Sequence, residues 1–199
     1  MDEKHILNPT ITMEKIIHQL ANRPFFVPEW NVDYLFLGTF NPEGGESVPY
    51  YYSRTRNQTW PTLSKIFKVD FNPKDKNFFD LLKSKRIACM DMILSVEIPT
   101  DSRNYIIGKG YSDSKIINAH VIRQYSTNQI LSVINKNPGC KVYSTWGKGS
   151  ALKEWQLEIN KIPNKIALVS PSLVARVPKG VNKVEYILAD WRSKIILPK

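Results

Sequence analysis

Four short runs of bulky apolar residues stand out along the chain, and each ends in a turn residue or a polar stretch. They cover Asn31–Gly38, Ile87–Leu94, Lys141–Thr145 and Ile166–Ser170. Runs of this length and composition are typical of strands that are buried on both faces of a sheet. The pattern therefore predicts four core strands.

Apolar residues at helical spacing fill the stretches between these runs. The spacing predicts helices from Thr59 onward, at Asn77–Lys85, in pieces of Ser114–Asn135, at Ser150–Ile159 and at Asn182–Ile196. Strands that alternate with helices indicate an α/β fold. We expect a three-layer sandwich, with a central, mostly parallel four-stranded sheet flanked by helices.

The first thirty residues carry an apolar stripe of their own. Four side chains have the spacing of one helix face: Ile11, Ile16, Ile17 and Leu20. We therefore expect an N-terminal helical arm over residues 1–30 and the main domain over residues 31–199.

Two long segments that follow predicted strands lack a regular pattern. Thr39–Asn57 contains several Pro and Gly residues, and Leu94–Asp113 is mostly polar. Loops of this length are uncommon in compact domains and are often functional. Because ligands of parallel sheets bind beside the carboxyl ends of strands, we expect the site among these two loops, Thr145–Gly149 and Ser170–Lys179.

The chain is strongly basic. Its 199 residues include 28 Lys and Arg against 18 Asp and Glu, which leaves a net charge of +10. Two segments, residues 47–69 and 159–184, contain basic residues and no acidic ones. If they meet in space, the charge favours a polyanion as partner; the alternative is a solvated basic surface without such a partner.

Several kinds of site are excluded by the residues that the sequence lacks. Cys89 and Cys140 are the only cysteines, so there is neither a disulfide framework nor a cysteine-rich zinc site, and we expect buried thiols. No phosphate-binding glycine motif follows the first strand, and Gly147–Gly149 is a weak anion-binding candidate. Three isolated histidines lack metal-ligand spacing and are interpreted as structural: His5, His18 and His120. We expect neither a metal nor a cofactor.

The hydropathy of the chain bears on its location. No apolar run approaches the length that spans a bilayer, and the first residues lack the order of a secretory signal. We therefore expect a cytoplasmic protein that does not bind membranes, associated with the nucleoid if the source is prokaryotic.

The first long loop and the residues after it combine aromatic and basic side chains. Tyr50–Trp60 reads Tyr-Tyr-Tyr-Ser-Arg-Thr-Arg-Asn-Gln-Thr-Trp. Aromatic faces stack on nucleobases and arginines hold phosphates, so this composition suits the binding of a nucleotide pulled from its stack. The alternative is that Trp60 and one tyrosine belong to the core and that the arginines are solvated.

Three motifs follow one another along the chain: Tyr34–Pro42 (Tyr-Leu-Phe-Leu-Gly-Thr-Phe-Asn-Pro), Tyr52–Trp60 and Leu168–Leu173 (Leu-Val-Ser-Pro-Ser-Leu). In this order they resemble the uracil-DNA glycosylase superfamily, nearest its hypoxanthine-DNA glycosylase and mismatch-specific uracil-DNA glycosylase branches. Cys89–Asp91 and Gly110–Asp113 are weaker echoes of motifs between them. The resemblance runs from about Val32 to Trp191, which is most of the chain.

The resemblance implies a DNA glycosylase that flips a deaminated base, such as uracil or hypoxanthine, out of DNA and hydrolyses its N-glycosidic bond. This reaction has oxocarbenium-like character, so the site needs an oriented water on one side and hydrogen-bond donors to the departing base on the other. The implied partner is DNA, the implied process is base excision repair, and we expect a monomer.

The resemblance also implies roles for single residues. Asn57, which we rank first, and Asn41 match asparagines that orient the water; the alternatives are a helix cap at Asn57 and a turn residue at Asn41. Ser170 matches the donor to the base, and Leu173 or Val174 would wedge into the gap that the flipped base leaves. The implied base pocket comprises Gly38, Thr39, Phe40, Tyr52 and Trp60, with Tyr52 stacked on the base, and the implied DNA contacts are Arg54, Arg56, Ser172, Leu173, Arg176 and Lys179.

The chain departs from the superfamily at two places. Ser170 stands where the superfamily has His or Asn, and Arg54 and Thr55 replace its usual His-Pro. Two rival interpretations follow: a catalytically weak or inactive nucleic-acid-binding module with the same fold, or an enzyme that acts on a free nucleoside or nucleotide.

Overall fold

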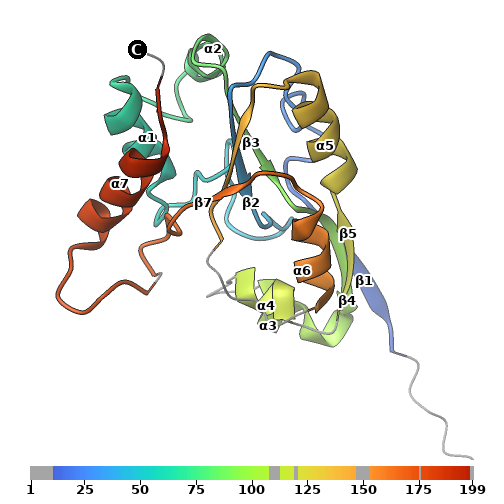
Figure 1. The fold of residues 1–199 in the computed structure, drawn as a ribbon. Coiled ribbons are helices and arrows are strands. Elements are labelled where there is room, and N and C mark those ends of the chain that lie inside the picture. Colours follow the sequence, from blue (N-terminus) through green and yellow to red (C-terminus); the bar gives the residue numbers. More distant parts are fainter. Residues whose placement is uncertain (1–10, 108–112, 119–120, 147–152, 175, 198–199) are drawn as a thin grey trace, which may run out of the picture.

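A four-stranded parallel sheet forms the centre of the protein in a computed structural model, which describes residues 11–107, 113–118, 121–146, 153–174 and 176–197 (Figure 1). Its strands lie in the order β3 (Ile87–Asp91), β2 (Tyr34–Gly38), β6 (Lys141–Ser144) and β7 (Ile166–Ala167). Every residue of β2 and β3 is buried. The prediction of four strands in a parallel sheet is confirmed, although β7 is a short strand that is not buried.

Helices lie on both faces of this sheet. α1 (Thr59–Phe67) and α7 (Lys183–Lys194) lie on one face, and α5 (Thr127–Lys136) and α6 (Lys153–Asn160) lie on the other (Figure 1). α2 (Phe78–Ser84) leads into β3. The helices predicted at these places are therefore present.

Side chains of β2 alternate between two hydrophobic clusters. Phe36 stacks on Tyr143 at 5.1 Å and on Trp191 of α7 at 5.8 Å, measured between ring centroids. Leu35 and Leu37 point to the opposite face and pack in the cluster that contains Trp155 and other residues of α5 and α6. Burial on both faces explains why β2 is a continuous apolar run rather than an alternating one.

A second, three-stranded antiparallel sheet was not predicted. Its order is β1 (Met13–Ile17), β4 (Ile93–Pro99) and β5 (Ile122–Tyr125). The helix predicted from the stripe at Ile16 and Leu20 is wrong, because the chain there forms β1. Adjacent β-branched residues suit a strand, and pairing with the distant β4 decides the conformation, which local spacing does not reveal.

The predicted second loop, Leu94–Asp113, is also wrong in part. It contains most of β4, a 3-10 turn at Thr100–Ser102 and α3 (Arg103–Ile107), and α4 (Asp113–Asn118) begins at its end. The strand predicted over Ile166–Ser170 is shorter, because the backbone N–H of Val169 donates to Asp190 of α7 at 2.8 Å instead of extending the ladder.

Among the described residues, no helix combines the length and apolar character that crossing a bilayer requires.

Candidate functional site

A cavity of about 260 Å³ opens at the carboxyl ends of β2, β3 and β6. The loops after β2 and β7 supply much of its wall, and the ends of β2 and β3, the residues after β6, α4 and α6 contribute the remainder. Its lining combines aromatic rings, amides, hydroxyls and charged groups: Gly38, Thr39, Phe40, Asn41, Tyr52, Arg54, Asn57, Asp91, Asp113, Ile117, Thr145, Trp146, Trp155, Ser170, Pro171 and Ser172.

The two segments without acidic residues meet at this cavity. Asn57 and Ser172 form an isolated antiparallel bridge. On either side of it, the N–H of Gln58 donates to the carbonyl of Pro171 at 2.8 Å, and the N–H of Leu173 donates to the carbonyl of Arg56 at 3.0 Å. The structure therefore brings together Tyr52, Asn57 and Ser170, which the sequence analysis placed in one pocket.

Three buried polar side chains form a hydrogen-bonded chain at the cavity. Oδ2 of Asp91, at the end of β3, lies 2.8 Å from Nδ2 of Asn41 and 2.9 Å from Nε2 of His18. The exposed fractions are 3% for Asp91, 7% for Asn41 and 0% for His18. A buried carboxylate is costly unless it is hydrogen-bonded, and here two donors converge on Oδ2.

Gly38 lies in close contact with the side chains of Asp91 and Tyr52. A Cβ atom at Gly38 would lie 2.2 Å from Oδ1 of Asp91 and 3.0 Å from the hydroxyl oxygen of Tyr52. No larger residue fits without displacing one of these groups. Glycine at the end of β2 is thus required by the side chains around it.

Tyr52 is held in an unusual backbone conformation. Its φ is 58°, in the left-handed region that costs most residues energy. Its hydroxyl lies 3.2 Å from Oγ1 of Thr145, which in turn donates to the carbonyl of Leu37 at 3.1 Å. Burial raises the pKa of Tyr52 well above its usual range, so the phenol stays neutral. The ring is therefore fixed on the cavity wall.

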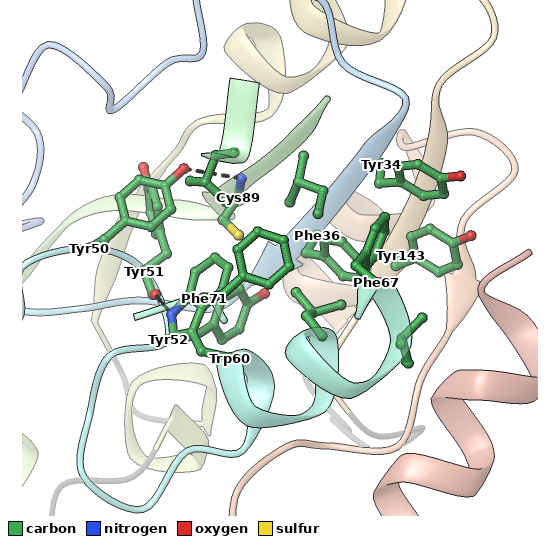
Figure 2. Close-up of a cluster of buried hydrophobic side chains, with 14 of the residues drawn as sticks. Tyr34, Phe36, Tyr50, Tyr51, Tyr52, Trp60, Phe67, Phe71, Cys89 and Tyr143 are labelled. Carbon is green, nitrogen blue, oxygen red and sulfur yellow. Dashed lines mark hydrogen bonds between the residues drawn. The ribbon is translucent and has the colours of Figure 1, made fainter. Parts of the chain in front are cut away.

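The other aromatic residues of this loop belong to the core (Figure 2). Tyr50 and Tyr51 are fully buried, and Trp60 donates from its indole N–H to the carbonyl of Tyr51 at 2.9 Å. The main-chain N–H of Cys89, itself buried, donates to the Tyr50 hydroxyl at 3.4 Å. Trp60, assigned to the base pocket from the sequence, therefore lies behind the cavity, packed among Tyr50, Phe71 and Phe78.

The amide of Asn57 and the hydroxyl of Ser170 both make local hydrogen bonds. Oδ1 of Asn57 accepts from the N–H of Thr59 at 2.9 Å, at the start of α1. Oγ of Ser170 accepts from the N–H of Ser172 at 3.4 Å. Asn57 thus lies one residue before Gln58, the N-cap of α1, and its amide oxygen binds the backbone of the first helical residue.

The basic residues expected to contact DNA lie at different depths. Arg54 is half-buried on the cavity wall, and its Nη2 donates to the carbonyl of Phe40 at 3.3 Å. Arg56, Arg176 and Lys179 are exposed. Leu173 is half-buried, whereas its neighbour Val174 is 66% exposed.

Sequence reasoning missed several residues of the site. Asp113 and Ile117 of α4 line the cavity. Trp146 and Trp155 also line it, and their ring centroids lie 5.5 Å apart. Asp91 was only part of a weak motif echo, and His18 was interpreted as structural because it stands alone in the sequence. The signal that could have found Asp91 is a single carboxylate within an otherwise apolar run.

Comparisons with known proteins assign no identity to the chain: no protein-family model matches it, and no curated protein matches it. Within the described residues, no group of three or more His, Cys, Asp or Glu side chains is arranged to hold a metal ion. The anion-binding candidate Gly147–Gly149 lies outside the described residues, as do His5 and His120.

Proposed function

We propose that the protein is a DNA glycosylase of the uracil-DNA glycosylase superfamily, with the three-layer sandwich of that superfamily. On this proposal it hydrolyses the N-glycosidic bond of a deaminated base, such as uracil or hypoxanthine, that has been flipped out of DNA. The observation that carries the proposal is one cavity that joins a fixed aromatic ring, Tyr52, with a buried amide, Asn41, and a hydroxyl, Ser170. Base excision by a cytoplasmic monomer is part of the same proposal.

The dimensions of the cavity support a single base as ligand. Its volume of about 260 Å³ lies below the roughly 300–1,000 Å³ of pockets for drug-sized ligands. A base that enters it loses stacking in the helix, and stacking on Tyr52 offsets part of that loss. The base edge would then face the hydroxyls of Ser170 and Thr145.

The chemistry follows from the neutral amide at Asn41. Its Oδ1 accepts a hydrogen bond from a water molecule and aims the water oxygen at C1′ of the sugar. The water oxygen bonds to C1′ while the C1′–N bond breaks and its electron pair leaves with the base, which gains a proton as the water loses one. An amide is a weak base, so the reaction favours bases that leave readily, and deaminated bases do.

Geometry favours Asn41 over Asn57 for this role, which reverses the ranking made from the sequence. The Nδ2 group of Asn41 is held by Asp91, which leaves its Oδ1 for water. The Oδ1 atom of Asn57 already accepts from the backbone of Thr59. Asn57 therefore supports the loop and the start of α1 in our proposal.

The surface around the cavity suits duplex DNA. Arg56 lies on the strand-like segment that pairs with the loop after β7, and Arg176 and Lys179 follow on that loop. These exposed cations can neutralise phosphates on both sides of a flipped nucleotide. The exposed Val174 is the apolar side chain best placed to fill the gap in the base stack.

A nucleic-acid-binding module without activity is the second candidate. The observation that favours it is Ser170 on the cavity wall, because its hydroxyl is a weaker donor than an imidazolium or an amide. Binding to DNA without base release would be its signature.

The decisive experiment incubates the protein with duplex oligonucleotides that contain uracil, hypoxanthine or xanthine, followed by alkali to cleave abasic sites. We expect strand cleavage with at least one of them, and Asn41→Ala should lower the rate of base release by about a hundredfold or more. Release of no base from any oligonucleotide, with DNA binding intact, would establish the binding module instead. Full activity of Asn41→Ala would reject the assigned amide.

A further inference from the structure

The most buried polar residue of the site comes from outside the parallel sheet. His18 follows β1 of the antiparallel sheet, and its side chain is fully buried. The residue is anchored from two sides, because its backbone N–H donates to the carbonyl of Leu94 at 2.8 Å and its ring lies among aromatic residues. The ring centroids of Phe26, Tyr51 and Phe40 lie 5.2, 5.5 and 5.8 Å from that of His18.

Hydrogen bonds fix the tautomer of this histidine. The backbone N–H of Leu20 donates to Nδ1 at 3.1 Å, so Nδ1 carries no proton. The proton therefore resides on Nε2, which lies 2.9 Å from Oδ2 of Asp91. His18 is a donor to the carboxylate, and the packed rings leave it no room to turn.

Asp91 in turn fixes the orientation of the Asn41 amide. Its Oδ2 atom accepts from His18 and from Nδ2 of Asn41, at 2.8 Å for the second bond. A carboxylate has no hydrogen to donate, so only the NH₂ group of Asn41 can face it. The amide of Asn41 cannot flip, and Oδ1 remains as the atom that it offers to the cavity.

We propose that His18 and Asp91 are positioning residues that lock the amide of Asn41 with its oxygen toward the bound water. This inference rests on the proposed function and deepens it, because it makes the segment after β1 part of the catalytic apparatus. Groups that hold a reacting residue in one orientation act on the rate of the chemical step rather than on ligand affinity. The two positioning residues should therefore affect the rate of base release and leave DNA affinity unchanged.

The test compares two substitutions at His18. His18→Phe keeps an aromatic ring in the aromatic surroundings but removes the donor to Asp91, whereas His18→Gln retains an N–H donor on a shorter planar group. Single-turnover base release is measured on the oligonucleotide that the wild type cleaves best, and the dissociation constant for the same duplex is measured by fluorescence anisotropy. We expect His18→Phe to slow release about a hundredfold with DNA affinity within twofold, and His18→Gln to recover most of that loss.

Two results would overturn the positioning role. One is wild-type release by His18→Phe; the other is a fall in DNA affinity that accounts for its whole defect. Melting temperatures of both variants establish that they fold. If His18→Phe does not fold, Asp91→Asn replaces it, because an amide at position 91 can donate to Asn41 and so permits the flipped orientation.

A measurement without substrate separates this inference from the proposed function. In the ¹⁵N–¹H spectrum of the wild type, the side-chain NH₂ signal of Asn41, identified by its loss in Asn41→Ala, should exchange slowly with solvent. It should exchange faster in Asp91→Asn. If the wild type releases no base but its Asn41 NH₂ group exchanges slowly, the glycosylase proposal is refuted and the positioning of Asn41 by Asp91 stands. Rapid exchange of this group in the wild type refutes the positioning, whether or not the enzyme is active.

Discussion

Asn41 and Asn57 both line the cavity, but their amides are engaged in opposite ways. Asn41 uses its NH₂ group on Asp91, while Asn57 uses its oxygen on the backbone N–H of Thr59. The two amides differ in which atom, the nitrogen or the oxygen, makes the hydrogen bond. Neither composition nor residue spacing reveals that difference. At the scale of the residue, the site is therefore defined by hydrogen-bond direction.

Substitution of Asn57 tests this distinction. Asn57→Ala removes the acceptor at the start of α1 and should lower the free energy of unfolding by about 1 kcal/mol, whereas Asn57→Asp keeps the acceptor and should retain most of it. Chemical denaturation of the three proteins measures the difference. Base release by Asn57→Ala should exceed that by Asn41→Ala at a temperature where both are folded; the reverse order would restore Asn57 as the residue that orients water.

At the scale of the element, helix α7 is held at its first turn. Asn182 caps it, with Oδ1 accepting from the N–H of Val184 at 3.0 Å and of Glu185 at 3.2 Å. Lys183, in the same turn, donates to the carbonyl of Leu173 at 2.7 Å. The beginning of the helix thus supports the loop that carries Ser170 and Ser172.

Loss of this cap should be measurable in stability. Asn182→Ala leaves two N–H groups of α7 without their side-chain acceptor and should lower the free energy of unfolding by about 1 kcal/mol, while Asn182→Ser should lower it by less. Urea denaturation followed by Trp fluorescence is the appropriate measurement, since Trp191 lies in this helix. Equal stability of the alanine variant and the wild type would show that the cap contributes nothing.

The elements differ in how far the sequence predicts them. The apolar runs at β2, β3 and β6 identify buried strands because every side chain there except Lys141 is buried. β1 and β5 pair with β4 from distant parts of the chain, and their short, half-exposed sequences lack a distinctive pattern. His18, which follows the unpredicted β1, could therefore not be assigned to the cavity in advance.

At the scale of the whole molecule, the positive charge is concentrated by the fold. Residues 47–69 and 159–184 are joined by the bridge between Asn57 and Ser172, so Arg54 and Arg56 lie beside the loop that carries Arg176 and Lys179. Lys136 is the last residue of α5 and lies near the amino end of β2, opposite the cavity. The side chain of the next residue, Asn137, accepts at 2.9 Å from the N–H of Val32, which precedes β2. Substitutions of cations beside the cavity therefore test DNA binding, and substitution of Lys136 serves as the control.

On the proposed function, DNA binding should depend steeply on salt, because exposed cations beside the cavity would neutralise phosphates. We expect the plot of log affinity against log salt concentration to become shallower by about 1 for each of Arg56→Ala, Arg176→Ala and Lys179→Ala. Lys136→Ala should leave the slope unchanged. Equal effects of all four substitutions would mean that duplex DNA does not bind at the cavity.

The bridge between Asn57 and Ser172 also has a consequence for biosynthesis. It joins positions separated by more than half of the chain, so the ribosome must deliver the last strand before the loop after β2 can settle. Until then the N–H of Gln58 and the carbonyl of Arg56 lack their partners, and Phe36 lacks Trp191 of α7, so the nascent polypeptide exposes aromatic surface. A premature stop upstream of Ser172 would accordingly leave a fragment prone to aggregate rather than a protein with partial activity.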